Sequence, residues 1–198
     1  MEYYLQTPIP KTEVKKLKVG DVIYITGIIV TARDEAHKKA LEFNEMGKKL
    51  PIDFKGLGVF HCGPIMRKTS KGWVTVAAGP TTSDRMEIFE DKFIEAFQPA
   101  VLIGKGGMGD NTGKACQKYA CVYTAFTGGA ALLAAKRIES VKDVFWLEEL
   151  GMPECLWVYE VNDFGPLIVT IDTHGENLTT KVANGVRLRR DKIMEEMK

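Results

Sequence analysis

Three cationic side chains come after expected β-strands and could together hold a carboxylate or a phosphate. Arg33 follows an apolar strand, Arg85 closes the segment Gly-Pro-Thr-Thr-Ser-Asp-Arg, and Lys105 lies in Gly-Lys-Gly-Gly-Met-Gly. An arginine guanidinium binds a carboxylate through two parallel N–H groups, and a lysine ammonium adds a point charge. The sequence therefore predicts Arg33, Arg85 and Lys105 as ligands of a small anionic substrate.

The glycines around these cations favour the same interpretation, because glycine lets backbone N–H groups approach an anion closely. A helix expected to begin near Ser83 would add partial positive charge. Each segment also has an ordinary interpretation: Thr82 or Ser83 could simply cap that helix, and 104–109 could be a tight turn. The glycine-rich segment is not a Walker A loop, and its match to a dinucleotide fingerprint is weak because no suitable acidic residue follows it.

The histidines leave alternatives open. His37 and Asp34 follow Arg33 on an expected helix, where they either orient its guanidinium or serve as a surface residue and a helix cap. His61 and His174 have no matching partners and are interpreted as structural or solvated. No Ser-His-Asp arrangement and no carboxylate pair is visible, so hydrolases of these two types are not indicated.

The elements that must position these residues alternate between strand and helix patterns. Strands are expected at 22–31, 58–64, 73–78, 101–103 and 122–126, with a late strand pair at 156–161 and 167–172. Helices are expected at 33–46, 85–97, 112–118 and 130–138, and the basic run at 187–192 is interpreted as a solvated helical face. This order predicts a single α/β domain over 1–198 with a mixed, partly barrel-like sheet, and ligands bind at the carboxyl ends of strands in such sheets.

Composition limits the classes of function. The 198 residues carry a formal net charge of +1, so no basic field indicates nucleic acid as a partner, and no apolar run is long enough to span a membrane. The N-terminus does not resemble a signal peptide, so we expect a cytoplasmic protein. Its four cysteines would then be reduced, and their spacing does not match a zinc or iron–sulfur site, so no metal ligand is expected in this chain.

Six motifs occur in one order over almost the whole chain and resemble one family. They are Thr-Ala-Arg-Asp-x-Ala-His at 31–37, His-Cys-Gly-Pro at 61–64, Gly-Pro-Thr-Thr-Ser-x-Arg at 79–85, Gly-Lys-Gly-Gly-Met at 104–108, Gly-Gly-Ala-Ala at 128–131 and Trp-x-x-Glu-Val-x-Asp-Phe-Gly-Pro at 157–166. The set resembles the β subunit of class I, iron–sulfur-dependent fumarases and the related L-tartrate dehydratases. The resemblance implies a swivelling β/β/α domain that packs against a larger α subunit.

The resemblance also implies a cofactor and site residues. In the family, the α part holds a [4Fe–4S] cluster through three cysteines, so the cluster is expected on the partner and not on this chain. Substrate-binding positions of the family match Arg33, Arg85 and Lys105, and Thr81 matches the residue proposed to transfer a proton. One departure is His61, where the family has an aromatic such as tyrosine about as often.

The resulting hypothesis is an enzyme: the β subunit of a hydro-lyase that reversibly hydrates fumarate to L-malate in complex with its α subunit. The chain alone is expected to be inactive, and to self-associate within an α2β2 complex. An L(+)-tartrate dehydratase, which yields oxaloacetate, is the alternative within the same class, because the cationic residues suit both dicarboxylates. A carboxylate-binding module without catalysis is the alternative from a different class.

Overall fold

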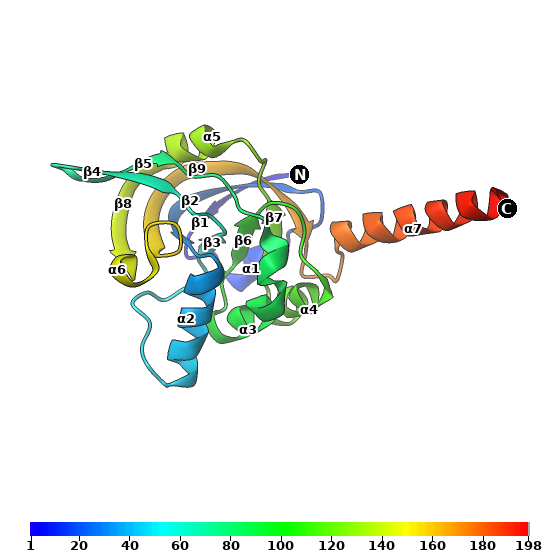
Figure 1. Ribbon diagram of the computed structural model, residues 1–198, viewed down its shortest axis with the longest axis horizontal. Helices are drawn as coiled ribbons and strands as arrows, with labels where there is room; N and C mark the ends of the chain where they lie inside the picture. The colour runs from blue at the N-terminus through cyan, green and yellow to red at the C-terminus, as the bar shows by residue number, and fades with distance from the viewer. Residues whose placement is uncertain (198) are drawn as a thin grey trace.

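The computed structural model describes residues 1–197 as a mixed α/β fold built around one large sheet (Figure 1). The strands are β1 (Glu2–Gln6), β2 (Val22–Thr31), β3 (Gly58–Phe60), β4 (Ile65–Thr69), β5 (Gly72–Ala77), β6 (Val101–Gly104), β7 (Val122–Ala125), β8 (Ile138–Phe145) and β9 (Leu156–Ile171). The helices are α1 (Lys11–Val14), α2 (Asp34–Glu45), α3 (Glu87–Phe97), α4 (Asp110–Tyr119), α5 (Ala131–Arg137), α6 (Leu147–Leu150) and α7 (Leu178–Glu196), and a 3-10 turn, η1 (Ser83–Met86), precedes α3.

The large sheet has the strand order β1-β2-β3-β6-β7-β9-β8 and an additional pairing between β2 and β9. Strands β1, β2, β3, β6 and β7 pair in parallel, whereas β9 is antiparallel to β2, β7 and β8. Because β9 pairs with both β2 and β7, strands β2, β3, β6, β7 and β9 close on themselves. The expected mixed, partly barrel-like α/β fold is therefore confirmed.

Side chains alternate between two apolar cores along the central strands, as the period of a β-strand requires. In β6, Val101 and Ile103 belong to the core inside the barrel, whereas Leu102 belongs to the second core. The second core also contains Phe93 of α3 and Cys116 of α4, so it lies between the sheet and its helices. The central strands are thus buried on both faces, and packing on each side holds their ends in place.

The expected late strand pair is wrong: 156–161 and 167–172 belong to one long strand, β9. The polar residues between them form an irregularity in the pairing with β2, where the register shifts between Ile25 and Gly27. Asp163 adopts a positive φ of 48°, and its N–H donates to the Thr26 hydroxyl oxygen at 3.0 Å. A bulge of this kind bends a strand without ending it.

Two further elements differ from expectation. The basic segment at 67–72, which lies between two expected strands, is mostly strand itself, because β4 and β5 form a hairpin that turns at 70–71. The helix expected at 130–138 ends at Arg137 and continues directly as β8, which sequence patterns did not predict. In Figure 1 the β4–β5 ribbon and α7 extend from the body in different directions. Within residues 1–197, no helix is both long and apolar enough to cross a membrane.

Candidate active site

The carboxyl ends of the parallel strands lie at one edge of the sheet, and the expected site residues are found there. Arg33 follows β2 and precedes α2, His61 follows β3, and Lys105 follows β6. These ends are neighbours, because Thr31 pairs with Phe60 and Phe60 pairs with Ile103. The topology therefore brings together residues that are far apart in the sequence.

The segment that carries Thr81 and Thr82 crosses this edge, and Arg85 follows it in η1. The Thr81 N–H donates to the His61 carbonyl at 2.7 Å, and the Lys105 N–H donates to the Thr81 carbonyl at 3.2 Å. Further along, the Ser83 N–H donates to the Lys105 carbonyl at 3.1 Å. These bonds place partly buried Thr81 directly beside exposed Lys105.

Two of the predicted arginines share one acidic neighbour. An Nη2 N–H of Arg85 donates to Asp34 Oδ2 at 2.8 Å, while Arg33 Nη2 lies 3.9 Å from the same oxygen and 3.2 Å from Glu154 Oε1. Arg33 is mostly covered, with 21% of its side chain exposed, whereas Arg85 is 51% exposed. Asp34 therefore holds the two guanidinium groups on the same side of the α2 start, and it contacts Arg85 more closely than Arg33.

Gly63 of the His-Cys-Gly-Pro motif makes room for the Arg33 guanidinium. A Cβ atom at Gly63 would overlap Arg33 Nη1 and would lie 2.9 Å from the Pro153 carbonyl oxygen. The backbone contact cannot relax as a side chain does, so any larger residue would push against both neighbours. The motif therefore has a steric role next to a predicted substrate ligand.

We expect Gly63→Ala to lower kcat/KM of the assembled enzyme by roughly 10- to 100-fold, because a displaced Arg33 guanidinium loses its alignment with the substrate. Steady-state kinetics check this, and Gly113→Ala is the matched control. A Cβ at Gly113 would meet only ordinary contacts at 3.9 Å, and alanine favours its helix by about 0.5–1 kcal/mol. Kinetics of Gly63→Ala equal to those of Gly113→Ala would contradict this role.

The glycine-rich segment provides less anion-binding capacity than its sequence suggests. The Glu87 carboxylate accepts the N–H groups of Gly109, Asn111 and Thr112 at 2.7, 3.0 and 3.3 Å, and so occupies the start of α4. Of these amides, that of Gly109 belongs to the glycine-rich segment, and it is therefore not free for a substrate. Lys105 itself forms no ion pair among residues 1–197, and it remains the cation of this segment.

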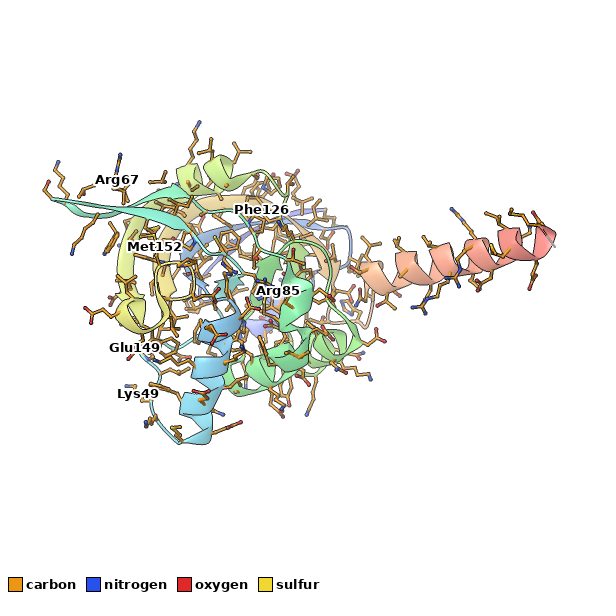
Figure 2. All side chains as sticks on the ribbon, in the orientation of Figure 1. Lys49, Arg67, Arg85, Phe126, Glu149 and Met152 are labelled. Atoms are coloured by element: carbon orange, nitrogen blue, oxygen red, sulfur yellow. The ribbon has the colours of Figure 1, made fainter. Side chains whose placement is uncertain are left out.

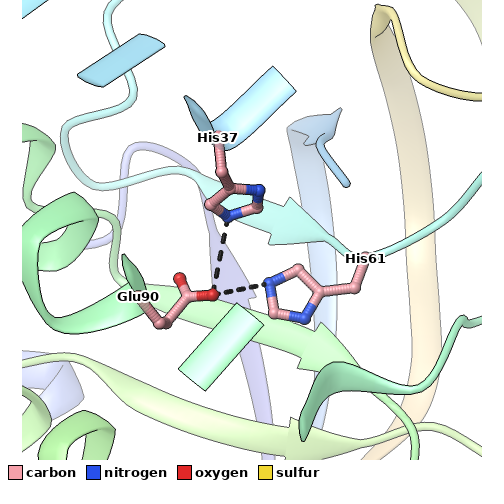
Figure 3. A group of neighbouring side chains, drawn as sticks. All are labelled: His37, His61 and Glu90. Atoms are coloured by element: carbon pink, nitrogen blue, oxygen red, sulfur yellow. Dashed lines mark ion pairs between the residues drawn. The ribbon is translucent and has the colours of Figure 1, made fainter. Parts of the chain in front are cut away.

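A buried cluster of His37, His61 and Glu90 lies beneath the edge (Figure 3). Glu90 Oε2 is 3.5 Å from His37 Nε2 and 3.4 Å from His61 Nε2, and all three side chains are fully buried. The other ring nitrogens reach the site segments, since His37 Nδ1 lies 2.8 Å from the Arg33 carbonyl and His61 Nδ1 lies 2.9 Å from Ser83 Oγ. The cluster thus connects the Arg33 and Ser83 segments from below.

Within this cluster, the neighbouring charges shift the pKa values in the opposite direction to burial. Burial alone would raise the pKa of the Glu90 carboxyl, but the neighbouring His37 and His61 lower it to about 2. Burial alone would lower the pKa of His37, but Glu90 outweighs it and raises that pKa above its ordinary value. Glu90 and His37 therefore stabilise each other's charged forms.

Several interpretations from sequence change here. His37 does not lie on the surface, His61 is fully buried and not solvated, and neither Thr82 nor Ser83 caps a helix through its side chain. Glu90 was missed altogether. Its spacing carried a signal, because it lies four residues after buried Met86 and four before buried Ile94, so it had to point into the core.

The cysteines do not form a site for a metal cluster. Cys62, Cys116, Cys121 and Cys155 are all free and buried. Burial raises the pKa of the Cys62 and Cys121 thiols well above the ordinary value and that of Cys155 to about 12. Iron–sulfur clusters need three or four cysteines close together, and among residues 1–197 the only group of three potential metal ligands is His37, His61 and Glu90. The cysteines therefore do not fit an iron–sulfur cluster.

Comparison with known proteins establishes the family of the chain. A family model described as the fumarase C-terminus matches residues 2–182. The chain belongs to the fumarase C-terminus family. The L(+)-tartrate dehydratase subunit beta of Escherichia coli (strain K12) is 47% identical over 197 residues, covering 100% of this chain and 96% of that protein. The resemblance expected from the six motifs is therefore confirmed.

Other members of the fumarase C-terminus family show how the domain is used. A provisionally named L(+)-tartrate dehydratase subunit beta of Methanocaldococcus jannaschii is 47% identical over 182 residues, covering 92% of this chain and 93% of that protein. A provisionally named class I fumarate hydratase of Geobacillus stearothermophilus is 42% identical over 175 residues, covering 88% of this chain but 33% of that protein. The domain thus occurs both as a separate subunit and within a longer hydro-lyase chain, and the subunit names imply a partner.

Proposed function

We propose that this chain is the β subunit of a class I fumarate hydratase, which reversibly hydrates fumarate to L-malate together with an α subunit. The observation that carries the proposal is the convergence of Arg33, Arg85, Lys105 and Thr81 at one sheet edge of a fumarase C-terminus domain. As the cysteines here do not fit a cluster, a [4Fe–4S] cofactor would be held by the α subunit. We place the complex in the cytoplasm.

The two arginines would bind the substrate carboxylates. Arg85 uses one N–H group on Asp34, and Arg33 forms an ion pair with Glu154 at 3.2 Å, so each guanidinium keeps donors for a ligand. Their acidic neighbours fix the orientation of the planar groups before substrate arrives. Lys105 would stabilise the negative charge that develops as the C3 proton of malate leaves.

Thr81 is the proposed proton-transfer residue. A threonine hydroxyl is a poor base at its ordinary pKa and needs a basic neighbour. The acidic side chains at this edge, Asp34 and Glu154, are already paired with arginines. The activating base would therefore come from the α subunit, across the same edge.

Self-association is supported by α7. Its side chains Leu178, Val182, Val186 and Ile193 recur at helical spacing and are exposed. Figure 1 shows this helix extending away from the body. We propose that α7 contributes to contacts between chains in an α2β2 complex.

L(+)-tartrate dehydration is the second candidate. It is favoured by relatives that share more than nine-tenths of their own length with this chain, since those of Escherichia coli and Methanocaldococcus jannaschii carry that name. The two arginines and Lys105 suit either dicarboxylate. A non-catalytic carboxylate-binding module is the candidate from a different class.

The assembled complex decides among these candidates. We expect the anaerobically reconstituted α and β chains to turn over fumarate and L-malate with kcat/KM at least about tenfold above that for L(+)-tartrate, a margin typical of a substrate-matched site. The reverse ratio would establish a tartrate dehydratase. Dicarboxylate binding without turnover of any of the three, in a complex with its cluster intact, would favour the binding module.

A further inference from the structure

We propose that His37, His61 and Glu90 form a buried structural site for one zinc ion. The ligands would be Nε2 of both histidines and the Glu90 carboxylate. The proposal does not depend on the proposed function. The site lies between α2, the end of β3 and α3.

The spacing of the ligand atoms fits an ion better than direct hydrogen bonds. The N–O distances of 3.5 and 3.4 Å exceed the roughly 2.7–2.9 Å of a charge-assisted hydrogen bond. A tetrahedral zinc ion with bonds of about 2.1 Å separates its ligand atoms by about 3.4 Å. The ligand atoms all lie within 4.8 Å of one another. A small inward shift of the imidazoles would therefore bring them to coordination distance from a common ion.

Four polar atoms in the cluster have no hydrogen-bond partner among the described residues. They are His37 Nε2, His61 Nε2 and both carboxylate oxygens of Glu90. Unpartnered buried polar groups are costly. Three of these atoms, the two Nε2 atoms and one Glu90 oxygen, lie within 4.8 Å of one another. The two Nε2 atoms and one Glu90 oxygen would supply three ligands, and the second Glu90 oxygen or a water would complete the coordination.

The outer contacts of the histidines match those of zinc ligands. Metal-bound histidines usually hydrogen-bond through their second ring nitrogen to a carbonyl, carboxylate or water, which fixes the tautomer. Nδ1 of His37 donates a hydrogen bond to the Arg33 carbonyl, and Nδ1 of His61 shares a hydrogen bond with Ser83 Oγ. Both rings are thereby held with Nε2 toward the centre.

The nature of the site indicates its role and its metal. Nitrogen and oxygen donors in a four-coordinate set suit zinc, and the fully buried side chains leave no position open for a substrate. The ion would bind as the chain folds and would hold the Arg33 and Ser83 segments together. It would be structural and not catalytic.

The test is the metal content of the full-length chain, purified after expression in zinc-supplemented medium and dialysed against a weak chelator. We expect elemental analysis to give about one zinc per chain. Glu90→Gln and His61→Phe should reduce zinc to background, whereas His174→Ala, which removes an exposed histidine outside the cluster, should retain it. Wild-type chain with less than about 0.1 zinc, or zinc unchanged in Glu90→Gln, would overturn the proposal.

A second measurement needs no variant, and it therefore tests the proposal even if the substituted chains fail to fold. Crystals of the wild-type chain, or of the α/β complex, should show an anomalous difference peak at the zinc edge between the three side chains. A protein with no peak there, or with iron in its place, would overturn the assignment.

Discussion

Replacing Arg85 by alanine is expected to lower kcat/KM of the reconstituted complex by roughly 30- to 1,000-fold. Loss of one charge-assisted hydrogen bond in a site that excludes water costs on the order of 2–4 kcal/mol of transition-state stabilisation. Arg33→Ala and Lys105→Ala should fall in the same range. Arg85→Lys should be nearly as harmful as Arg85→Ala, because a lysine cannot reproduce the planar pair of N–H groups.

The control for these variants is Arg67→Ala. Arg67 is exposed on the β4–β5 ribbon, away from Arg85 in Figure 2, so its loss should change stability by no more than about 0.5 kcal/mol and leave kinetics intact. Steady-state kinetics with melting temperature and cluster content measure all five variants. If Arg33→Ala, Arg85→Ala and Lys105→Ala behave like Arg67→Ala in an intact complex, the substrate binds elsewhere.

Removing the hydroxyl of Thr81 should have the second large effect. Thr81→Val keeps the shape of the side chain but cannot transfer a proton, so we expect kcat to fall about 100- to 10,000-fold with little change in KM. Thr81→Ser keeps a hydroxyl and should retain most of kcat. The backbone bonds of Thr81 to His61 and Lys105 are unchanged in both variants, so the segment stays in place.

The comparison of these two variants separates chemistry from binding. A Thr81→Val complex with raised KM and unchanged kcat would show that the hydroxyl contacts substrate without moving a proton. Equal losses in Thr81→Ser and Thr81→Val would show that packing, and not the hydroxyl, is what the site requires.

Local patterns were enough to predict the elements that carry Arg33 and Lys105. The run Val22–Thr31 is rich in β-branched residues and is β2 with the same bounds, and the apolar run before Gly104 is β6. Strand ends in an α/β sheet share an edge, so the general location of the site followed from the order of elements. What the patterns could not show was the extended Thr81 segment, because its pairing with Lys105 and His61 depends on long-range backbone bonds.

The buried cluster was hidden for a different reason. Glu90 lies in α3, whose sequence is amphipathic, and His37 lies in α2, far away in the sequence. No local sequence pattern therefore includes both residues. Long β9 was divided in two because its polar bulge resembles a turn, and only the pairing of Thr26 with Asp163 shows that the strand continues. In both cases the decisive information is the three-dimensional neighbour of a polar residue.

An anaerobic titration of this chain into its purified α subunit tests the central claim most directly. The claim is that the β chain supplies the substrate-binding half of an active site whose other half is on the partner. We predict no hydratase activity for either chain alone, and activity that rises linearly and saturates at one β chain per α chain. Full activity of one chain alone, or none in a 1:1 complex with its cluster intact and all three dicarboxylates offered, would contradict it.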